Sequence, residues 1–261
     1  MKHHFVKTRN YEELQAGVRF MEERGSPSSC LCLVHGEPGV GKTRNISKWG
    51  ADSGAILVKG HVGMTLDGIL WAVSQGLGLP KKNNRTELIS AQVEALQISG
   101  QPIVFDEAQF GLFMRHAGKS AAGIEYLRDI AERGNTFVML VCHESEVQGF
   151  SASAHVRGRI AHRVEMHNAG AQDTTAFIQS LCEVPVTAAA CAVVHGQTRG
   201  KFRLLENAIS AMERLAKFKG LAQLDAPDIA GVSLVVDHEQ GLGPKLAVPA
   251  GKKAAPKAGE R

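Results

Sequence analysis

The segment GEPGVGKT, residues 36–43, constrains the fold of this chain more than any other stretch. It matches the pattern G-x-x-x-x-G-K-[ST], in which glycines let the backbone fold tightly around phosphate groups with its N–H groups pointing inward. An apolar run at residues 30–35 precedes it, and a predicted helix at residues 43–50 follows it. This strand–loop–helix context is the one that the pattern requires, so the segment predicts an α/β domain that binds a nucleoside triphosphate.

The individual residues of this loop have separate predicted tasks. Lys42 is expected to reach the β- and γ-phosphates of ATP, and the Thr43 hydroxyl is expected to bind Mg²⁺. The helix that starts after the loop adds its partial positive charge. The predicted nucleotide-binding residues are Gly36, Glu37, Pro38, Gly39, Val40, Gly41, Lys42, Thr43 and Arg44.

A second part of the site is predicted where the apolar run at residues 103–105 ends in two acidic residues. Asp106, at the carboxyl end of this strand, would face the phosphate loop and hold Mg²⁺ through water. Glu107 would then orient or deprotonate the attacking water. Two adjacent acids favour ATP hydrolysis over binding alone, because a simple switch needs only the metal ligand.

The order of the predicted elements indicates a parallel sheet covered by helices on both faces. Strands are predicted at residues 30–35, 55–59, 102–105, 136–142 and 163–166, and helices at 10–24, 43–50, 66–77, 86–99 (with Thr86 as its cap) and 120–133. After residue 168 the pattern changes to helices alone, at 171–182, 187–195, 202–217 and 226–232. The predicted organisation is an N-terminal helical segment (1–28), a P-loop core (29–167), a helical lid (168–236) and a disordered basic tail (237–261).

The composition bears on the partners and the cellular compartment of the protein more than on the reaction that it catalyses. The 261 residues carry a formal charge of +4, which permits a polyanionic partner without requiring one. Five cysteines without paired spacing indicate buried core thiols in a reducing compartment. No apolar segment is long enough to span a bilayer, so a cytoplasmic location with no membrane partner is expected.

Residues 36–43, together with Asp106-Glu107-Ala108-Gln109, resemble the Walker A and Walker B motifs of the AAA+ ATPases. The sequence DEAQ with a helical lid after the core is most similar to the branch that contains transposition protein B of Mu-like phages and the transposon regulators TnsC and TniB. The resemblance covers about residues 11–235. It implies a P-loop AAA+ core with a five-stranded parallel sheet, followed by a small all-helical lid domain.

Three further residues receive roles from this resemblance. His143 follows the strand at 136–142, where the family usually carries a polar sensor-1 residue, often Asn. Arg159 corresponds to the arginine that reaches the nucleotide of the neighbouring subunit, with Arg157 or Arg163 as alternatives. Arg203, in the segment Gly200-Lys201-Phe202-Arg203, corresponds to the sensor-2 arginine of the lid. Together with Lys42, Asp106 and Glu107, the residues Arg159, Arg203 and His143 form the expected catalytic set.

Family members without a separate DNA-reading domain bind duplex DNA inside a helical or ring assembly, so DNA contacts are expected from the ATPase core. Basic and small polar side chains in three loops suit phosphates more than base edges. The candidates are Lys59, His61, Thr65, Lys81, Lys82, Arg85, Arg115 and Lys119.

The leading hypothesis is an ATPase that binds DNA without sequence preference and assembles into a filament or ring on target DNA. Its expected partners are double-stranded DNA, further copies of itself with nucleotide at the subunit interfaces, and a transposase that receives the target and is activated, in the cytoplasm of a bacterial host. Alternatives are a replication ATPase resembling a helicase loader, a scaffold that coats DNA with incidental hydrolysis, and a small-molecule P-loop kinase. The acidic pair and the Arg203 motif disfavour the kinase.

Overall fold

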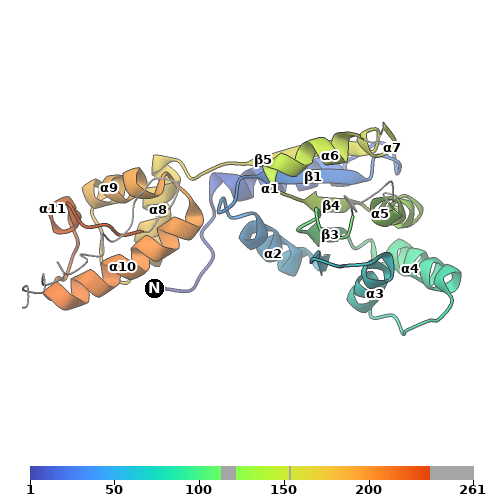
Figure 1. Cartoon of the computed structure of the whole chain (residues 1–261), viewed down its shortest axis with the longest axis horizontal. Helices are drawn as coiled ribbons and strands as arrows, with labels where there is room; N and C mark the ends of the chain where they lie inside the picture. Colours follow the sequence, from blue (N-terminus) through green and yellow to red (C-terminus); the bar gives the residue numbers. More distant parts are fainter. Residues whose placement is uncertain (113–121, 153, 236–261) are drawn as a thin grey trace, which may run out of the picture.

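The computed structural model describes residues 1–112, 122–152 and 154–235 (Figure 1). Figure 1 shows an α/β core beside a separate group of helices, and the N-terminal segment running from these helices to the core. The predicted tail at 237–261 and the DNA-contact candidates Arg115 and Lys119 lie outside the described residues.

The predicted alternation of strands and helices is present in the core. In chain order its elements are α1 (Arg9–Glu22), β1 (Leu31–Gly36), α2 (Lys42–Ser53), β2 (Ile56–Lys59), α3 (Leu66–Gly76), α4 (Arg85–Ser99), β3 (Ile103–Asp106), α5 (Ala122–Arg133), β4 (Val138–Val141), the 3-10 helix η1 (Glu144–Glu146), α6 (Val147–Ala152), α7 (Ala154–Arg157) and β5 (Ile160–Met166). The C-terminal helical domain contains α8 (Ala171–Leu181), α9 (Ala188–Thr198), α10 (Phe202–Lys219) and α11 (Ala226–Ile229).

The five strands form one parallel sheet in the order β2-β3-β4-β1-β5, which confirms the predicted fold class. Because all strands run the same way, their carboxyl ends meet at one edge of the sheet. This edge brings together the end of β1 before the glycine loop and the end of β3 before the acidic pair. β5 begins three residues before its predicted start, because it pairs with β1 from Leu31 opposite Ile160 onward.

Both faces of the sheet are covered, as the continuous apolar strands predict. In β1, Leu31 and Leu33 pack on the face covered by α3, α4 and α5, whereas Cys32 and Val34 pack on the opposite face with α1 and α2. These four side chains are fully buried. Burial of each aliphatic side chain stabilises the fold by about 1.5–3 kcal/mol, so β1 is held firmly on both sides.

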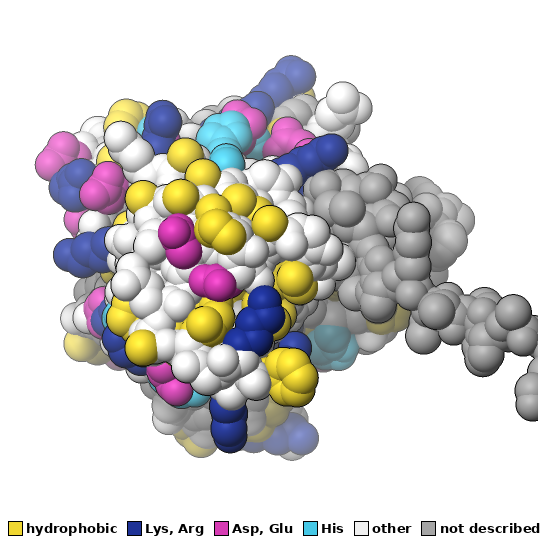
Figure 2. All heavy atoms as spheres, turned by 90° about the vertical axis from the view of Figure 1, so that its left-hand side faces the viewer, with side chains coloured by type: hydrophobic (Ala, Val, Ile, Leu, Met, Phe, Trp, Pro, Cys, Tyr) yellow, Lys and Arg dark blue, Asp and Glu magenta, His cyan; other side chains and the backbone are white. Residues whose placement is uncertain are grey.

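The helical domain has an apolar core of its own, formed by α8 to α11. The inward face of α10 carries Leu205, Ile209 and Met212, which are fully buried there. Figure 2 looks onto this end of the molecule and shows hydrophobic, acidic and basic side chains interspersed over its surface.

Two local predictions are corrected by the structure. The helix α4 is capped by Asn84 and not by Thr86, since the Asn84 side chain accepts hydrogen bonds from the backbone N–H groups of Thr86 and Glu87. The segment between β4 and β5, for which no element was predicted, forms η1, α6 and α7.

All five cysteines are buried and free, as their spacing indicated. Burial raises the pKa of the Cys32 and Cys142 thiols to about 12, so both stay protonated at neutral pH. Within the described residues, no helix is long and apolar enough to cross a membrane.

Candidate active site

The glycine loop between β1 and α2 has a backbone that requires glycine at two of its positions. Gly36 ends β1 with a φ of 153°, and a Cβ atom at this position would lie 2.3 Å from the Met166 carbonyl oxygen of β5. Gly41 caps α2 in the left-handed region, with a φ of 87°. The loop therefore needs glycine at Gly36 for close packing and at Gly41 for its backbone angle.

Lys42 is folded back over this loop. Its ammonium group donates hydrogen bonds to the carbonyl oxygens of Gly36 at 2.6 Å and Glu37 at 2.8 Å. Burial lowers the pKa of Lys42, and the neighbouring Cys142 and Glu107 oppose that shift. The ammonium group therefore lies beside the glycine loop. When a triphosphate binds there, phosphate oxygens would replace these two carbonyl oxygens as the partners of Lys42.

The first residue of the acidic pair faces the loop, as predicted. The Thr43 hydroxyl donates a 3.0 Å hydrogen bond to one Asp106 carboxylate oxygen, and the Glu107 backbone N–H donates to the other at 3.0 Å. Burial raises the pKa of Asp106, while the hydrogen bond from Thr43 acts in the opposite direction. A hydroxyl and a carboxylate oxygen this close form a hard-oxygen donor set that suits Mg²⁺.

Glu107 has an unusual backbone conformation for a non-glycine residue, with a φ of 54°. This turn directs its carboxylate toward the side-chain amide of Gln109, which donates a 2.5 Å hydrogen bond to it. The side-chain oxygen of Gln109 is buried and has no hydrogen-bond partner among the described residues. A left-handed backbone in a non-glycine residue costs about 1–3 kcal/mol, and such residues are concentrated at functional sites. The conformation of Glu107 is therefore consistent with a functional role.

His143 follows β4 at the same edge of the sheet. Its Nδ1 atom accepts a 3.1 Å hydrogen bond from the Ser145 backbone N–H, which caps η1. The next residue, Glu144, pairs with His35 at 2.5 Å beside the start of the glycine loop. His143 is thus placed near the predicted nucleotide, and its role as sensor 1 stays a prediction.

The helical domain touches the glycine loop directly. The Phe202 backbone N–H, at the start of α10, donates a 2.9 Å hydrogen bond to the Gly39 carbonyl oxygen. Arg203 follows on the same helix and is exposed, with no ion pair to any residue that the structure describes. A Cβ added at Gly39 would lie 3.8 Å from the Cβ of Arg203, so the side chain of this predicted sensor-2 arginine begins next to the glycine loop.

Arg44, which was predicted to contact nucleotide, connects α2 to the helical domain. It forms an ion pair with Glu206 of α10, and its guanidinium lies over the Phe177 ring at 5.2 Å from the centroid. It also donates to the His4 carbonyl oxygen at 3.1 Å. These partners keep Arg44 on the side of α2 that faces the helical domain.

The N-terminal segment is a part of this site that the sequence did not reveal. Phe5 and Val6 close over Gly41 together with Phe177 and Phe202, leaving a cavity of only about 10 Å³. That is room for about one water molecule. A nucleotide base could enter between these apolar side chains only if the N-terminal segment or the helical domain moved.

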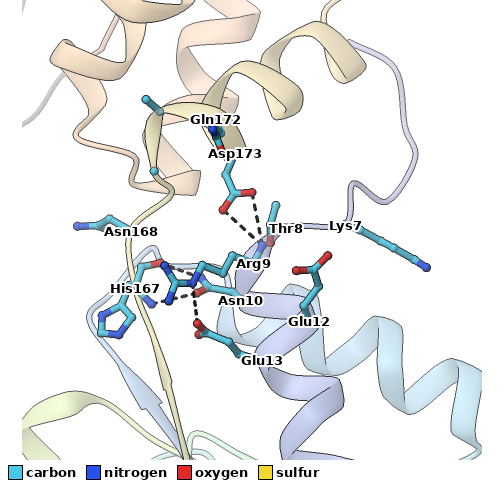
Figure 3. Close-up of a pocket in the computed structure, with 12 residues that line it drawn as sticks. Lys7, Thr8, Arg9, Asn10, Glu12, Glu13, His167, Asn168, Gln172 and Asp173 are labelled. Carbon is cyan, nitrogen blue, oxygen red and sulfur yellow. Dashed lines mark hydrogen bonds and ion pairs between the residues drawn. The ribbon is translucent and has the colours of Figure 1, made fainter.

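Asn10 joins the loop, α1 and the link to the helical domain (Figure 3). Its side-chain amide donates to the carbonyl oxygens of Val40 at 3.0 Å and His167 at 2.7 Å, and its oxygen accepts from the His167 backbone N–H at 3.1 Å. Beside it, a cavity of about 600 Å³ separates α1 from the start of α8. Asn10 was predicted only as a helix residue, because its partners are far away in the sequence.

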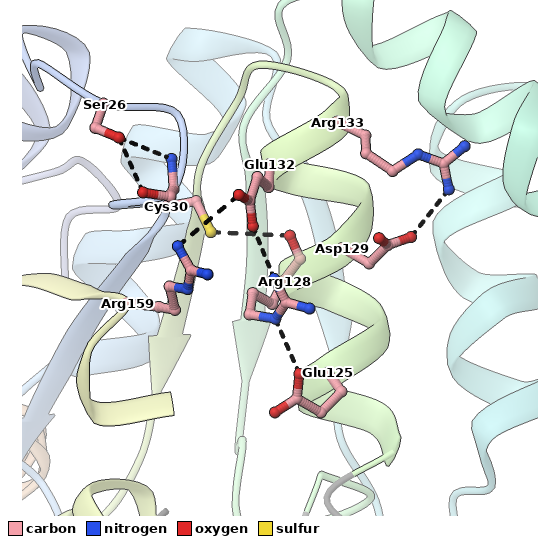
Figure 4. Close-up of polar contacts among 9 residues, drawn as sticks. Ser26, Cys30, Glu125, Arg128, Asp129, Glu132, Arg133 and Arg159 are labelled. Atoms are coloured by element: carbon pink, nitrogen blue, oxygen red, sulfur yellow. Dashed lines mark hydrogen bonds and ion pairs between the residues drawn. The ribbon is translucent and has the colours of Figure 1, made fainter. Parts of the chain in front are cut away.

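The three candidate trans-acting arginines lie near the amino end of β5, at the edge of the sheet opposite the glycine loop. Arg159 lies 3.8 Å from Glu132, which also binds Arg128 on α5 (Figure 4). Arg157 is exposed and forms no ion pair with a described residue. Arg163 is exposed on the edge strand β5.

The described DNA-contact candidates fall into two groups. Lys59 lies opposite Asp106 in the sheet, where its charge opposes the rise in the pKa of that carboxyl that burial causes. His61 and Thr65 follow β2, where Thr65 caps α3. Lys81, Lys82 and Arg85 surround a groove between α3 and α4, where Arg85 forms an ion pair with Asp67 at 2.6 Å.

A model of the family described as AAA domain matches residues 28–149, which contain the glycine loop, the acidic pair and β4. A search of curated proteins finds no significant match. This family model does not single out the transposition branch that DEAQ resembles.

Three solved structures are similar over most of the chain. Cdc6p from Pyrobaculum aerophilum has a TM-score of 0.62 and 15% identity, covering 87% of this chain and 68% of its own. The Thermotoga maritima RuvB Holliday junction branch migration motor has a TM-score of 0.57 and 15% identity, with the same coverage. The Aeropyrum pernix Orc1 protein in complex with DNA has a TM-score of 0.55 and 14% identity, covering 86% of this chain and 64% of its own. The chain therefore has the AAA+ P-loop fold.

Proposed function

We propose that this protein is an ATPase that assembles on DNA and uses ATP binding and hydrolysis to time that assembly. The observation that carries the ATPase assignment is the contact of Thr43 with Asp106, next to Lys42 and Glu107. Lys42 would bind the terminal phosphates, Thr43 and Asp106 would hold Mg²⁺, and Glu107 would accept the proton of the attacking water. Mg²⁺ bound there would neutralise charge that builds up on the phosphates during transfer.

The helical domain acts as the lid in this proposal. Its first contacts, from Phe202 to Gly39 and from Arg44 to Glu206, connect the lid directly to the residues around the phosphates. Arg203 reaches the nucleotide from α10, and the base enters between the N-terminal segment and Phe177 when that segment or the lid moves. Any movement of the lid is thereby coupled to the nucleotide state.

DNA is the proposed partner because the chain is similar in fold to a protein whose structure was solved with DNA and to a branch migration motor. The DEAQ sequence favours transposition proteins, with a transposase as the recipient of the bound DNA. A helicase-loader-like ATPase, whose partner is a protein ring, is the second candidate. We expect the gene beside this one to encode an integrase-type transposase, and sequencing of the neighbouring genes separates the two.

Assembly on DNA tests the proposal directly. With ATP and Mg²⁺, we expect filaments or rings on duplex DNA by negative-stain electron microscopy, and none with Lys42→Ala, because this variant loses the phosphate contact. Matched Lys217→Ala, on the surface of α10, should assemble normally. Absence of DNA-bound assemblies under every nucleotide condition contradicts the proposal.

A mixing experiment tests whether one subunit completes the site of the next. Arg159→Ala and Lys42→Ala should each be inactive alone, whereas their mixture should regain ATPase activity. In mixed assemblies, some interfaces join an intact Lys42 to an intact Arg159. The same experiment with Arg157→Ala and Arg163→Ala identifies which arginine acts in trans. Full activity of all three single variants rules out a trans-acting arginine among them.

A further inference from the structure

A groove on the core, between α3 and the loop that leads to α4, has no part in the nucleotide site. In Figure 1 this loop lies at the end of the molecule opposite the helical domain. The groove has a volume of about 500 Å³, within the range of roughly 300–1,000 Å³ typical of pockets that hold small ligands.

The floor of this groove is apolar and ends in an exposed aromatic ring. Leu70 and Leu88 are buried beneath it, whereas Trp71 on α3 keeps 37% of its surface exposed. The Trp71 indole N–H has no hydrogen-bond partner among the described residues. An aromatic ring that is open to a groove offers a flat face on which a planar group of a ligand can stack.

The rim of the groove is positively charged. Arg85 is neutralised by Asp67 at 2.6 Å, but Lys81 and Lys82 are exposed and form no ion pair with any residue in the described ranges. Two uncompensated ammonium groups therefore flank the indole ring. Such a site suits a ligand that carries both negative charge and a flat apolar face.

We infer that this groove binds single-stranded DNA, with one unpaired base stacked on Trp71 and the adjacent phosphates on Lys81 and Lys82. The combination of a basic groove and an open aromatic side chain is the means by which proteins hold single strands without sequence preference. Duplex DNA does not fit, because its bases are already stacked and paired and present no free face. The choice of DNA as the polymer rests on the proposed function, whereas the stacking site rests on the groove alone.

Fluorescence anisotropy with the full chain and three labelled probes tests the inference: an oligo-dT strand, a duplex of equal length and an oligo-U strand. We expect Trp71→Ala to weaken oligo-dT binding about 5- to 150-fold, the effect of losing one base–aromatic stack, and to leave duplex binding unchanged. Trp71→Phe should keep most of the affinity. Phe218→Ala, which removes an aromatic ring that is 89% exposed on the helical domain, should have no effect.

Two further readings come from the same titrations. The chain has two tryptophans and Trp49 is buried, so oligo-dT should quench the fluorescence of Trp71, and Trp71→Phe should abolish the quenching. Replacing both Lys81 and Lys82 by Gln should reduce the salt slope for oligo-dT by about 1.4, the value for two phosphate contacts on a single strand.

Several outcomes would overturn the inference: unchanged oligo-dT affinity in Trp71→Ala, equal losses for oligo-dT and duplex, or quenching by oligo-U or polyglutamate but not by oligo-dT. The proposed function is judged separately. Trp71-dependent binding of oligo-dT without ATP-dependent assembly on duplex supports the groove and contradicts the assembly. ATP-dependent assembly on duplex DNA without any Trp71-dependent binding of oligo-dT does the reverse.

Discussion

Glu107→Gln reduces ATP turnover by about 10²–10⁴-fold while ATP binding survives, because the amide cannot accept the proton of the attacking water. Lys42, Thr43 and Asp106 remain in place in this variant, so the ATP-bound protein should accumulate on DNA. Phosphate release measures the turnover, and titration with a fluorescent ATP analogue measures the affinity.

Glu94→Gln is the matched control, since Glu94 is an exposed residue of α4 away from the site. It should leave both measurements unchanged. Normal turnover in Glu107→Gln would remove Glu107 from its role as the base and leave Asp106 as the only acid of the pair with a function.

Gly200→Ala destabilises the link between the core and the helical domain by about 2–5 kcal/mol, since it combines backbone strain with overpacking. Gly200 has a φ of 71°, and an added Cβ would lie 2.0 Å from the Ala169 carbonyl oxygen. The same glycine accepts a 2.9 Å hydrogen bond from the Ala169 backbone N–H through its carbonyl oxygen. We expect the melting temperature to fall by roughly 5–15 °C in a calorimetric scan.

Gly196→Ala is the control for this variant, because it adds the same methyl group within α9, where no described atom beyond the adjacent residues and the local helix backbone lies within 4 Å of the new Cβ. It should stabilise the helix by about 0.5–1 kcal/mol. ATP affinity should fall in Gly200→Ala only, since the displaced α10 no longer places Phe202 against Gly39. Equal melting temperatures for the two variants would contradict the close packing of Gly200 against Ala169.

The sequence predicted those features of the core that depend on local pattern. The apolar run before the glycine loop and the alternation of strands and helices were sufficient for the sheet. The start of β5 was not visible, because Ala161 and His162 lack an apolar pattern and are in a strand only through pairing with β1. The cap of α4 was ambiguous, because both Asn84 and Thr86 are good capping residues.

The predicted site was least complete where its contacts span the whole chain. Asn10 has the ordinary sequence context of a helix start, yet it binds Val40 and His167 in space. Arg44 follows the glycine loop directly, yet its partner is Glu206, which lies in the other domain. Such pairings are set by the docking of two domains, for which a single sequence offers no periodic signal.

β1 is the earliest strand in the chain, and both strands that pair with it come from much later residues, ending at Val141 and Met166. On the ribosome, at about 5–20 residues per second, β1 would wait roughly 7–26 s for β5 to be synthesised. Until then the Met166 carbonyl group that packs on Gly36 is missing, and a strand whose residues are all buried in the folded protein lacks one neighbour. Nascent chains of this protein should therefore need protection by a chaperone over this interval, and ATP can stabilise only those that have passed Met166.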